Sequence, residues 1–137
     1  MPPDRAQDAR LWLAKARDDL RAGEVNLAAT PPLVEDTLFH AQQAAEKSIK
    51  GFLVWHGHAF RRIHDLREVG GAAIGLDLSL EPLLHRAARL SPFAGVFRYP
   101  TEMGIPTMEE AREALALARE VFDAILARLP QDVRSDL

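Results

Sequence analysis

Apolar residues recur along the chain at intervals of three and four, and no alternating strand pattern competes with this spacing. The pattern predicts long amphipathic helices over about residues 4–29, 32–55 and 107–129, with shorter helices over about 64–69 and 80–90. The gaps between them hold the helix breakers Pro31-Pro32, Gly57, Gly70-Gly71, Ser91-Pro92 and Pro130. The predicted fold is therefore all-α, an antiparallel (up-down) four-helix bundle with one additional short helix.

The ends of the last predicted helix are well marked. Thr107 and Glu110 have the spacing of a capping box, which predicts the start of the helix. Its apolar stripe consists of Ala111, Leu115, Ala118, Phe122, Ile125 and Leu129. The next residue, Pro130, predicts its end.

The second predicted helix carries polar residues on one narrow face. At 100° per residue, that stripe contains Asp36, His40, Gln43, Lys47 and, at its edge, Lys50. The opposite side holds Leu38, Ala41, Ala45, Ile49 and Phe52, together with Gln42. We expect the apolar side to be buried and the polar stripe to face either solvent or a groove. An imidazole, an amide and an ammonium group can bind a phosphate or the edge of a base, but a solvated or intersubunit face explains the stripe equally well.

Size and composition fit one folded domain spanning residues 1–137. The chain is 47% hydrophobic and 27% charged, which is ordinary for a globular protein. It contains no cysteine, which excludes disulfides, thiol catalysis and thiolate zinc sites. No apolar run resembles a signal peptide or approaches the roughly 20 residues of a membrane span. We therefore expect a cytoplasmic protein without contact with membranes.

Charge is distributed unevenly around a net value of −3. Residues 1–46 carry 5 basic and 8 acidic side chains, and residues 101–137 carry 4 and 8, so both ends are acidic. Residues 47–100 carry 8 basic and 4 acidic side chains and four of the five histidines. Such a segment attracts a phosphate-bearing ligand or an acidic partner, although a solvated basic face accounts for it as well.

Motifs of the common enzyme classes are missing. Neither a P-loop nor a G-x-G-x-x-G sequence occurs, and nothing supports a Ser/His/Asp triad. His56, His58 and His64 form only a weak zinc signal, so we expect no metal and no cofactor. Asp65 stands where it can cap the following helix, and Arg98 can bind a phosphate or pair with an acid.

The segment Phe39-His40-Ala41-Gln42-Gln43-Ala44-Ala45-Glu46-Lys47-Ser48-Ile49-Lys50-Gly51 resembles the characteristic second helix of HEPN domains (higher eukaryotes and prokaryotes nucleotide-binding). Trp12 with Ala16-x-x-Asp19-Leu20, His64-Asp65-Leu66 and Phe97-Arg98-Tyr99-Pro100 support the resemblance in the expected order. It implies an antiparallel four-helix core, a tendency to form homodimers, and frequent pairing with a minimal nucleotidyltransferase, as in toxin–antitoxin pairs. Many HEPN proteins are also metal-independent ribonucleases whose motif is an arginine, four to six residues, and a histidine.

That ribonuclease motif is absent, because no arginine lies five to seven residues before any of the five histidines. The first hypothesis is therefore a non-catalytic module that binds a nucleotide or a partner, with RNA a less favoured ligand. One alternative is a divergent ribonuclease toxin that uses Arg61 or Arg62 with His64, and another is a purely structural dimerisation domain. The residues expected to line the binding site of the first hypothesis are His40, Gln43, Lys47, Lys50, His64, Asp65, Arg98 and Tyr99.

Overall fold

Three long helices form the body of the molecule. The computed structural model describes residues 4–60, 65–95, 104–135 and 137. The long helices are α1 (Arg5–Ala28), α2 (Val34–Trp55) and α5 (Met108–Ala127). The shorter elements are α3 (Leu66–Leu76), α4 (Glu81–Ala87), α6 (Gln131–Arg134) and the 3₁₀ segments η1 (Leu78–Leu80) and η2 (Ala88–Ala94).

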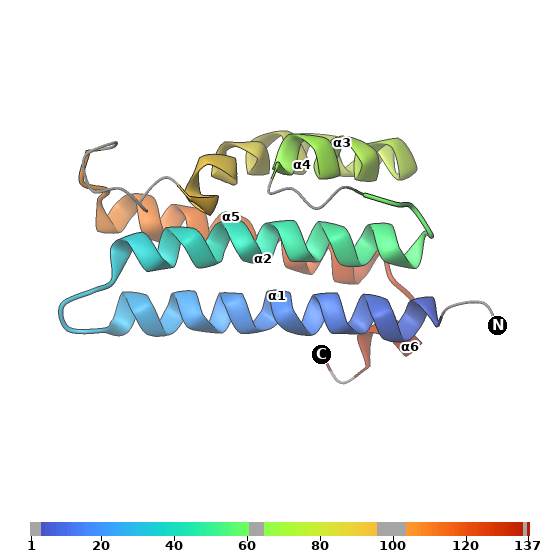
Figure 1. The fold of residues 1–137 in the computed structure, drawn as a ribbon, viewed down its shortest axis with the longest axis horizontal. Coiled ribbons are helices and arrows are strands. Elements are labelled where there is room, and N and C mark those ends of the chain that lie inside the picture. Colours follow the sequence, from blue (N-terminus) through green and yellow to red (C-terminus); the bar gives the residue numbers. More distant parts are fainter. Residues whose placement is uncertain (1–3, 61–64, 96–103, 136) are drawn as a thin grey trace.

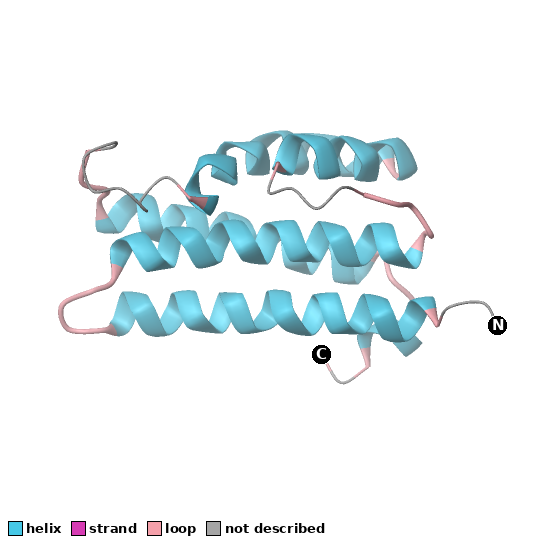
Figure 2. Cartoon of the chain, viewed as in Figure 1, coloured by secondary structure: helices cyan, strands magenta, loops and turns pink. Residues whose placement is uncertain are grey.

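These elements pack as a helical bundle, and the predicted all-α bundle is confirmed (Figure 1). Helix α2 lies between α1 on one side and the layer of α3 and α4 on the other, and α5 packs against both α1 and α2 (Figure 1). Figure 2 shows helices and connecting loops only within the described ranges. None of these described helices is both long enough and apolar enough to cross a membrane.

The central place of α2 in the bundle explains its composition. Fourteen of its 22 residues are buried, and many of them are small, including Ala41, Ala44 and Ala45. Small side chains let neighbouring helices approach closely. At Gly51, a Cβ atom would lie 3.1 Å from Leu13 Cγ and 3.3 Å from Trp12 Cβ on α1. The apolar side expected for this helix is buried as predicted, but half of its other residues are buried as well.

Helix α5 begins and packs as the sequence predicts. The backbone N–H of Glu110 donates to Thr107 Oγ1 at 3.0 Å, and the N–H of Thr107 donates to Glu110 Oε1 at 3.2 Å, which completes the capping box. All six residues of the predicted apolar stripe are buried. A short helix, α6, follows Pro130 and was not predicted. Pro130 was expected only to end the preceding helix, but this residue is also the N-cap of α6.

The prediction that the third helix breaks at Gly70-Gly71 is wrong, because α3 continues through both glycines to Leu76. Glycine inside a helix costs roughly 1 kcal/mol relative to alanine. Burial of Leu66, Val69, Gly70 and Ala73 along one face offsets that cost through packing. The start is as expected, since the carboxylate of Asp65 caps the helix by accepting from the N–H of Arg67 at 2.9 Å.

The fourth helix also departs from its predicted bounds. Its α-helical part ends at Ala87, and the chain continues as the 3₁₀ segment η2 through Ser91 and Pro92 to Ala94. Pro92 has no backbone N–H for an α-helical hydrogen bond, and short 3₁₀ turns are frequent where α-helices end. The hydroxyl of Ser91 accepts from the N–H of Leu66 at 2.9 Å, which ties η2 to the start of α3.

Candidate functional site on α1 and α2

Asp19 of α1 joins two residues of the predicted polar stripe. His40 Nδ1 lies 2.8 Å from Asp19 Oδ1, and the ammonium group of Lys47 donates to Asp19 Oδ2 at 2.7 Å. His40 and Lys47 are two helical turns apart on α2, so they approach the carboxylate from its two sides. Their side chains remain 29% and 24% exposed, whereas that of Asp19 is 9% exposed. The stripe therefore docks α2 on α1 and still reaches the surface at its edge.

A second polar cluster is fully internal. Gln43 donates to Gln42 at 2.5 Å, Gln42 donates to Glu46 at 3.0 Å, and Lys50 donates to Glu46 at 3.0 Å. The side chains of Glu46 and Lys50 are only 2% and 6% exposed. Such a buried ion pair is tolerated because each charged group has a hydrogen-bonded counterpart. Within the described ranges, every buried side-chain nitrogen or oxygen has a hydrogen-bond partner.

Two aromatic rings enclose the buried cation of Lys50. Its Nζ lies 5.5 Å from the ring centroid of Trp12 on α1 and 5.3 Å from that of Phe60, which follows α2. The two rings meet edge to face with their centroids 5.7 Å apart. An ammonium group over aromatic rings is favourable when it is desolvated. Lys50 therefore links α1, α2 and the segment after α2.

A groove along α1 and α2 opens beside these clusters. Its volume is about 590 Å³, and it is lined by Asp8, Leu11, Trp12, Lys15, Lys47 and Val54. Leu11 is 59% exposed, which is high for a large apolar side chain. The groove thus combines an apolar and aromatic wall with two ammonium groups and one carboxylate. This chemistry suits an apolar side chain of a partner protein or a flat ligand that carries an anionic group.

The structure places the predicted site residues in different settings. The prediction that the polar stripe faces solvent or a groove is wrong for Gln43 and Lys50, which are buried, whereas Lys47 does line the groove. Asp65 caps α3. The remaining candidates, His64, Arg98 and Tyr99, lie outside the described residues, so their relation to the groove stays a prediction. In the ranges that are described, no three His, Asp or Glu side chains gather as metal ligands would.

The predicted site residues did not include Asp19, Gln42 and Glu46, which hold the polar clusters together. Asp19 lies beside the buried Leu20 and three residues after the buried Ala16, and an acid among core positions is a signal that it has a buried partner. Gln42, Glu46 and Lys50 recur every four residues, which is the spacing of side-chain pairs on a helix. Gln42 was assigned to the apolar side of the helix, so the polar series Gln42, Glu46 and Lys50 was not recognised.

Comparison with known protein families gives a match to this chain. The family described as "HEPN domain" matches residues 9–129, which include α1 to α5 almost completely and all residues of the groove except Asp8. No curated protein and no solved structure matches the chain.

Proposed function

The chain belongs to the HEPN domain family, and from this premise we propose that it is a non-catalytic module that binds a nucleotide or a protein partner through the groove on α1 and α2. Family membership supports a nucleotide-binding or ribonuclease-type module in general terms. Our proposal is narrower: a single cytoplasmic module that works with a separate minimal nucleotidyltransferase, in the manner of a toxin–antitoxin pair.

The position of Lys47 carries the proposal. Its ammonium group is held at 2.7 Å by Asp19 and at the same time borders the groove. A cation that a neighbouring carboxylate keeps in place loses little side-chain freedom when it binds an anion. Trp12 and Leu11 provide the apolar contact area beside it. Absence of the arginine–histidine ribonuclease motif supports the non-catalytic part, because the acid/base and phosphate-binding groups of that reaction are not supplied at their usual spacing.

Calorimetric titration of wild type and Lys47→Ala tests the proposal, with ATP and, where the neighbouring gene encodes one, with the nucleotidyltransferase. We expect Lys47→Ala to weaken binding by about 1.5–3 kcal/mol, the contribution of a charge-assisted hydrogen bond. Arg112→Ala is the control, because it removes an exposed cation of α5 that does not line the groove. Equal affinity of wild type and Lys47→Ala, or no binding of either ligand, would contradict the proposal.

Incubation of the purified protein with RNA tests the non-catalytic part. We expect no cleavage in the absence of metal ions. Metal-independent cleavage that is lost in His64→Ala would instead support the divergent ribonuclease.

A further inference from the structure

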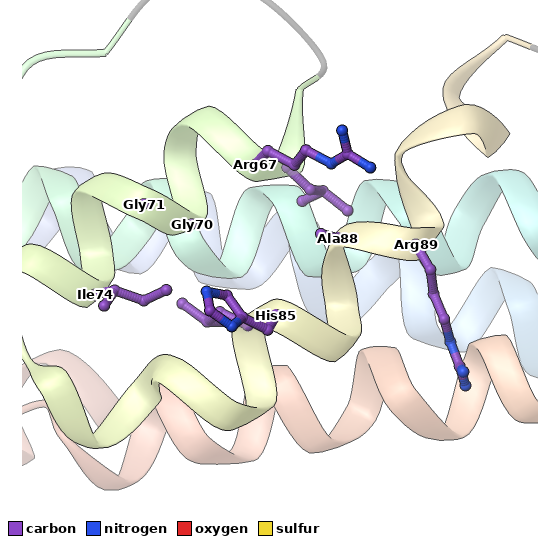
Figure 3. A pocket seen from close by; sticks show the side chains of 9 residues that line it. Arg67, Gly70, Gly71, Ile74, His85, Ala88 and Arg89 are labelled. Atoms are coloured by element: carbon purple, nitrogen blue, oxygen red, sulfur yellow. The ribbon is translucent and has the colours of Figure 1, made fainter.

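A second cleft is lined by residues of α3, α4 and η2 (Figure 3). Helices α3 and α4 lie on the side of α2 away from α1 (Figure 1). Its volume is about 460 Å³, within the range of small-ligand pockets. Ile74 and Ala88 supply partly exposed apolar surface to its lining, and the neighbouring Leu66 and Leu84 are buried. Because α2 separates it from the groove on α1, this cleft is independent of the function proposed above.

Arg67, His85 and Arg89 supply all the ionisable groups that line this cleft. Figure 3 shows Arg67 on α3, His85 on α4 and Arg89 on η2, with the guanidinium groups of the two arginines pointing in different directions. No acidic side chain is among its lining residues. The cleft is thus an apolar hollow with a positively charged rim.

The two arginines of the rim differ from their neighbours. Arg86 pairs with Glu120 at 2.9 Å, and Arg128 pairs with Asp77 at 3.1 Å. In the described part of the chain, by contrast, no side chain pairs with the guanidinium group of Arg67 or Arg89. Both groups are therefore available to an anionic ligand, and their planar donors match a phosphate.

Gly71 leaves one wall of the cleft open. A Cβ atom at this position would meet no heavy atom within 4 Å, so the backbone of α3 is accessible there. Because Gly71 itself lines the cleft, we expect a larger side chain at this position to begin without clash and to narrow the cleft. Leucine is also a better helix former than glycine, so such a variant preserves α3.

We propose that this cleft binds a small organic phosphate monoester. The two guanidinium charges match the two negative charges of the phosphate, His85 donates a hydrogen bond, and the body of the ligand packs on Ile74 and Ala88. Arg67 and Arg89 are long, exposed side chains, and their guanidinium groups swing toward the phosphate on binding.

Calorimetric titration with adenosine 5′-monophosphate as the probe tests this proposal. We expect wild type to bind it, and Gly71→Leu to abolish binding by filling the cleft. Arg67→Ala/Arg89→Ala should weaken binding by about tenfold or more, in line with the loss of charge-assisted hydrogen bonds. The matched control is Arg86→Ala, which removes an arginine of α4 that is already paired with Glu120 and lies outside the cleft. That variant should bind as wild type does.

Two further titrations identify the ligand group and the site that binds it. Adenosine should bind at least about tenfold more weakly, because it lacks the phosphate group. Lys47→Ala should leave binding unchanged, since Lys47 lies in the groove on α1 and α2. The proposal is overturned if wild type does not bind the monophosphate, or if Gly71→Leu or the double arginine variant binds it as tightly as wild type does. It is also overturned if adenosine binds as tightly as the monophosphate, or if Lys47→Ala loses binding. Equally tight binding of an oligoadenylate without a terminal phosphate would assign the cleft to an RNA strand and overturn it too.

Discussion

At the scale of single residues, Lys50 has the most demanding position, because its charged group is nearly inaccessible to water. Glu46 balances the charge at 3.0 Å, and the rings of Trp12 and Phe60 surround it. Removing one partner of a buried pair leaves the other charge without compensation, which costs more than the pair itself contributes.

Lys50→Met should therefore destabilise the protein by about 3–5 kcal/mol, as measured by urea unfolding at neutral pH. The double variant Glu46→Gln/Lys50→Met removes both charges and keeps an acceptor for Gln42. This double variant should recover a large part of the free energy of unfolding that Lys50→Met loses. A double variant no more stable than Lys50→Met would show that the charge left on Glu46 is not the source of the destabilisation.

Asp77 contributes to the stability of the folded state in a way that depends on pH. Hydrogen bonds from the hydroxyl group and then the backbone N–H of Ser79, assisted by the charge of Arg128, hold the pKa of Asp77 below its usual value of 3.8. A lowered pKa in the folded state means that the ionised carboxylate stabilises the fold. This stabilisation is complete above the pKa of the unfolded chain and is lost as the pH falls through the lower pKa of the folded state.

Asp77→Asn should consequently unfold at lower urea concentration than wild type at neutral pH, and the difference should shrink below about pH 4. Urea midpoints of both proteins, measured from neutral to acidic pH, check this. Asparagine retains the oxygen that accepts from Ser79, so the comparison isolates the charge. A difference that stays constant with pH would contradict the role of ionisation.

At the scale of the elements, glycines decide how closely the helices pack. A Cβ atom at Gly51 would press on Leu13 and Trp12 of α1, whereas one at Gly75 of α3 would meet nothing within 4 Å. The same substitution should thus have opposite effects at the two positions.

Gly51→Ala should lower the free energy of unfolding by about 1–2 kcal/mol, because the cost of overpacking exceeds the gain in helix propensity. Gly75→Ala should raise it by about 0.5–1 kcal/mol, because only the propensity gain applies. Thermal or urea unfolding measures both. If both substitutions stabilise the protein, α1 and α2 can move slightly apart at Gly51 without lowering the free energy of unfolding.

Prediction from sequence succeeded for the long helices and failed where the third and fourth helices end. The long helices have a regular apolar spacing, and the capping box at Thr107 is a local signal, so both could be read without tertiary information. Continuation of α3 through Gly70 depends on burial against the rest of the bundle, which the local sequence does not encode. The site follows the same rule: Lys47 was identified by its face of the helix, but its contact with Asp19 depends on how two helices pack.

At the scale of the whole molecule, the bundle leaves the groove on α1 and α2 uncovered, and a second copy can cover it in competition with the ligands proposed above. We expect light scattering at micromolar concentration to give twice the mass of the 15.2 kDa chain. Leu11→Glu should shift the protein to the monomer, because it places a charge in the apolar part of the interface. Val25→Glu is the matched control, since Val25 is similarly exposed on α1 but does not line the groove. A wild-type mass near 15.2 kDa would contradict the dimer.

The packing of Trp12 also gives the protein an internal optical reporter. Its indole lies beside the ammonium group of Lys50, touches Phe60 edge to face, and forms part of the groove wall. Indole emission responds to nearby charge and to water, so a partner in the groove or a displacement of Phe60 changes the spectrum. The chain has two tryptophans, and replacing Trp55 with phenylalanine leaves all indole emission to Trp12. Occupancy of the groove can then be followed in solution without attaching a dye.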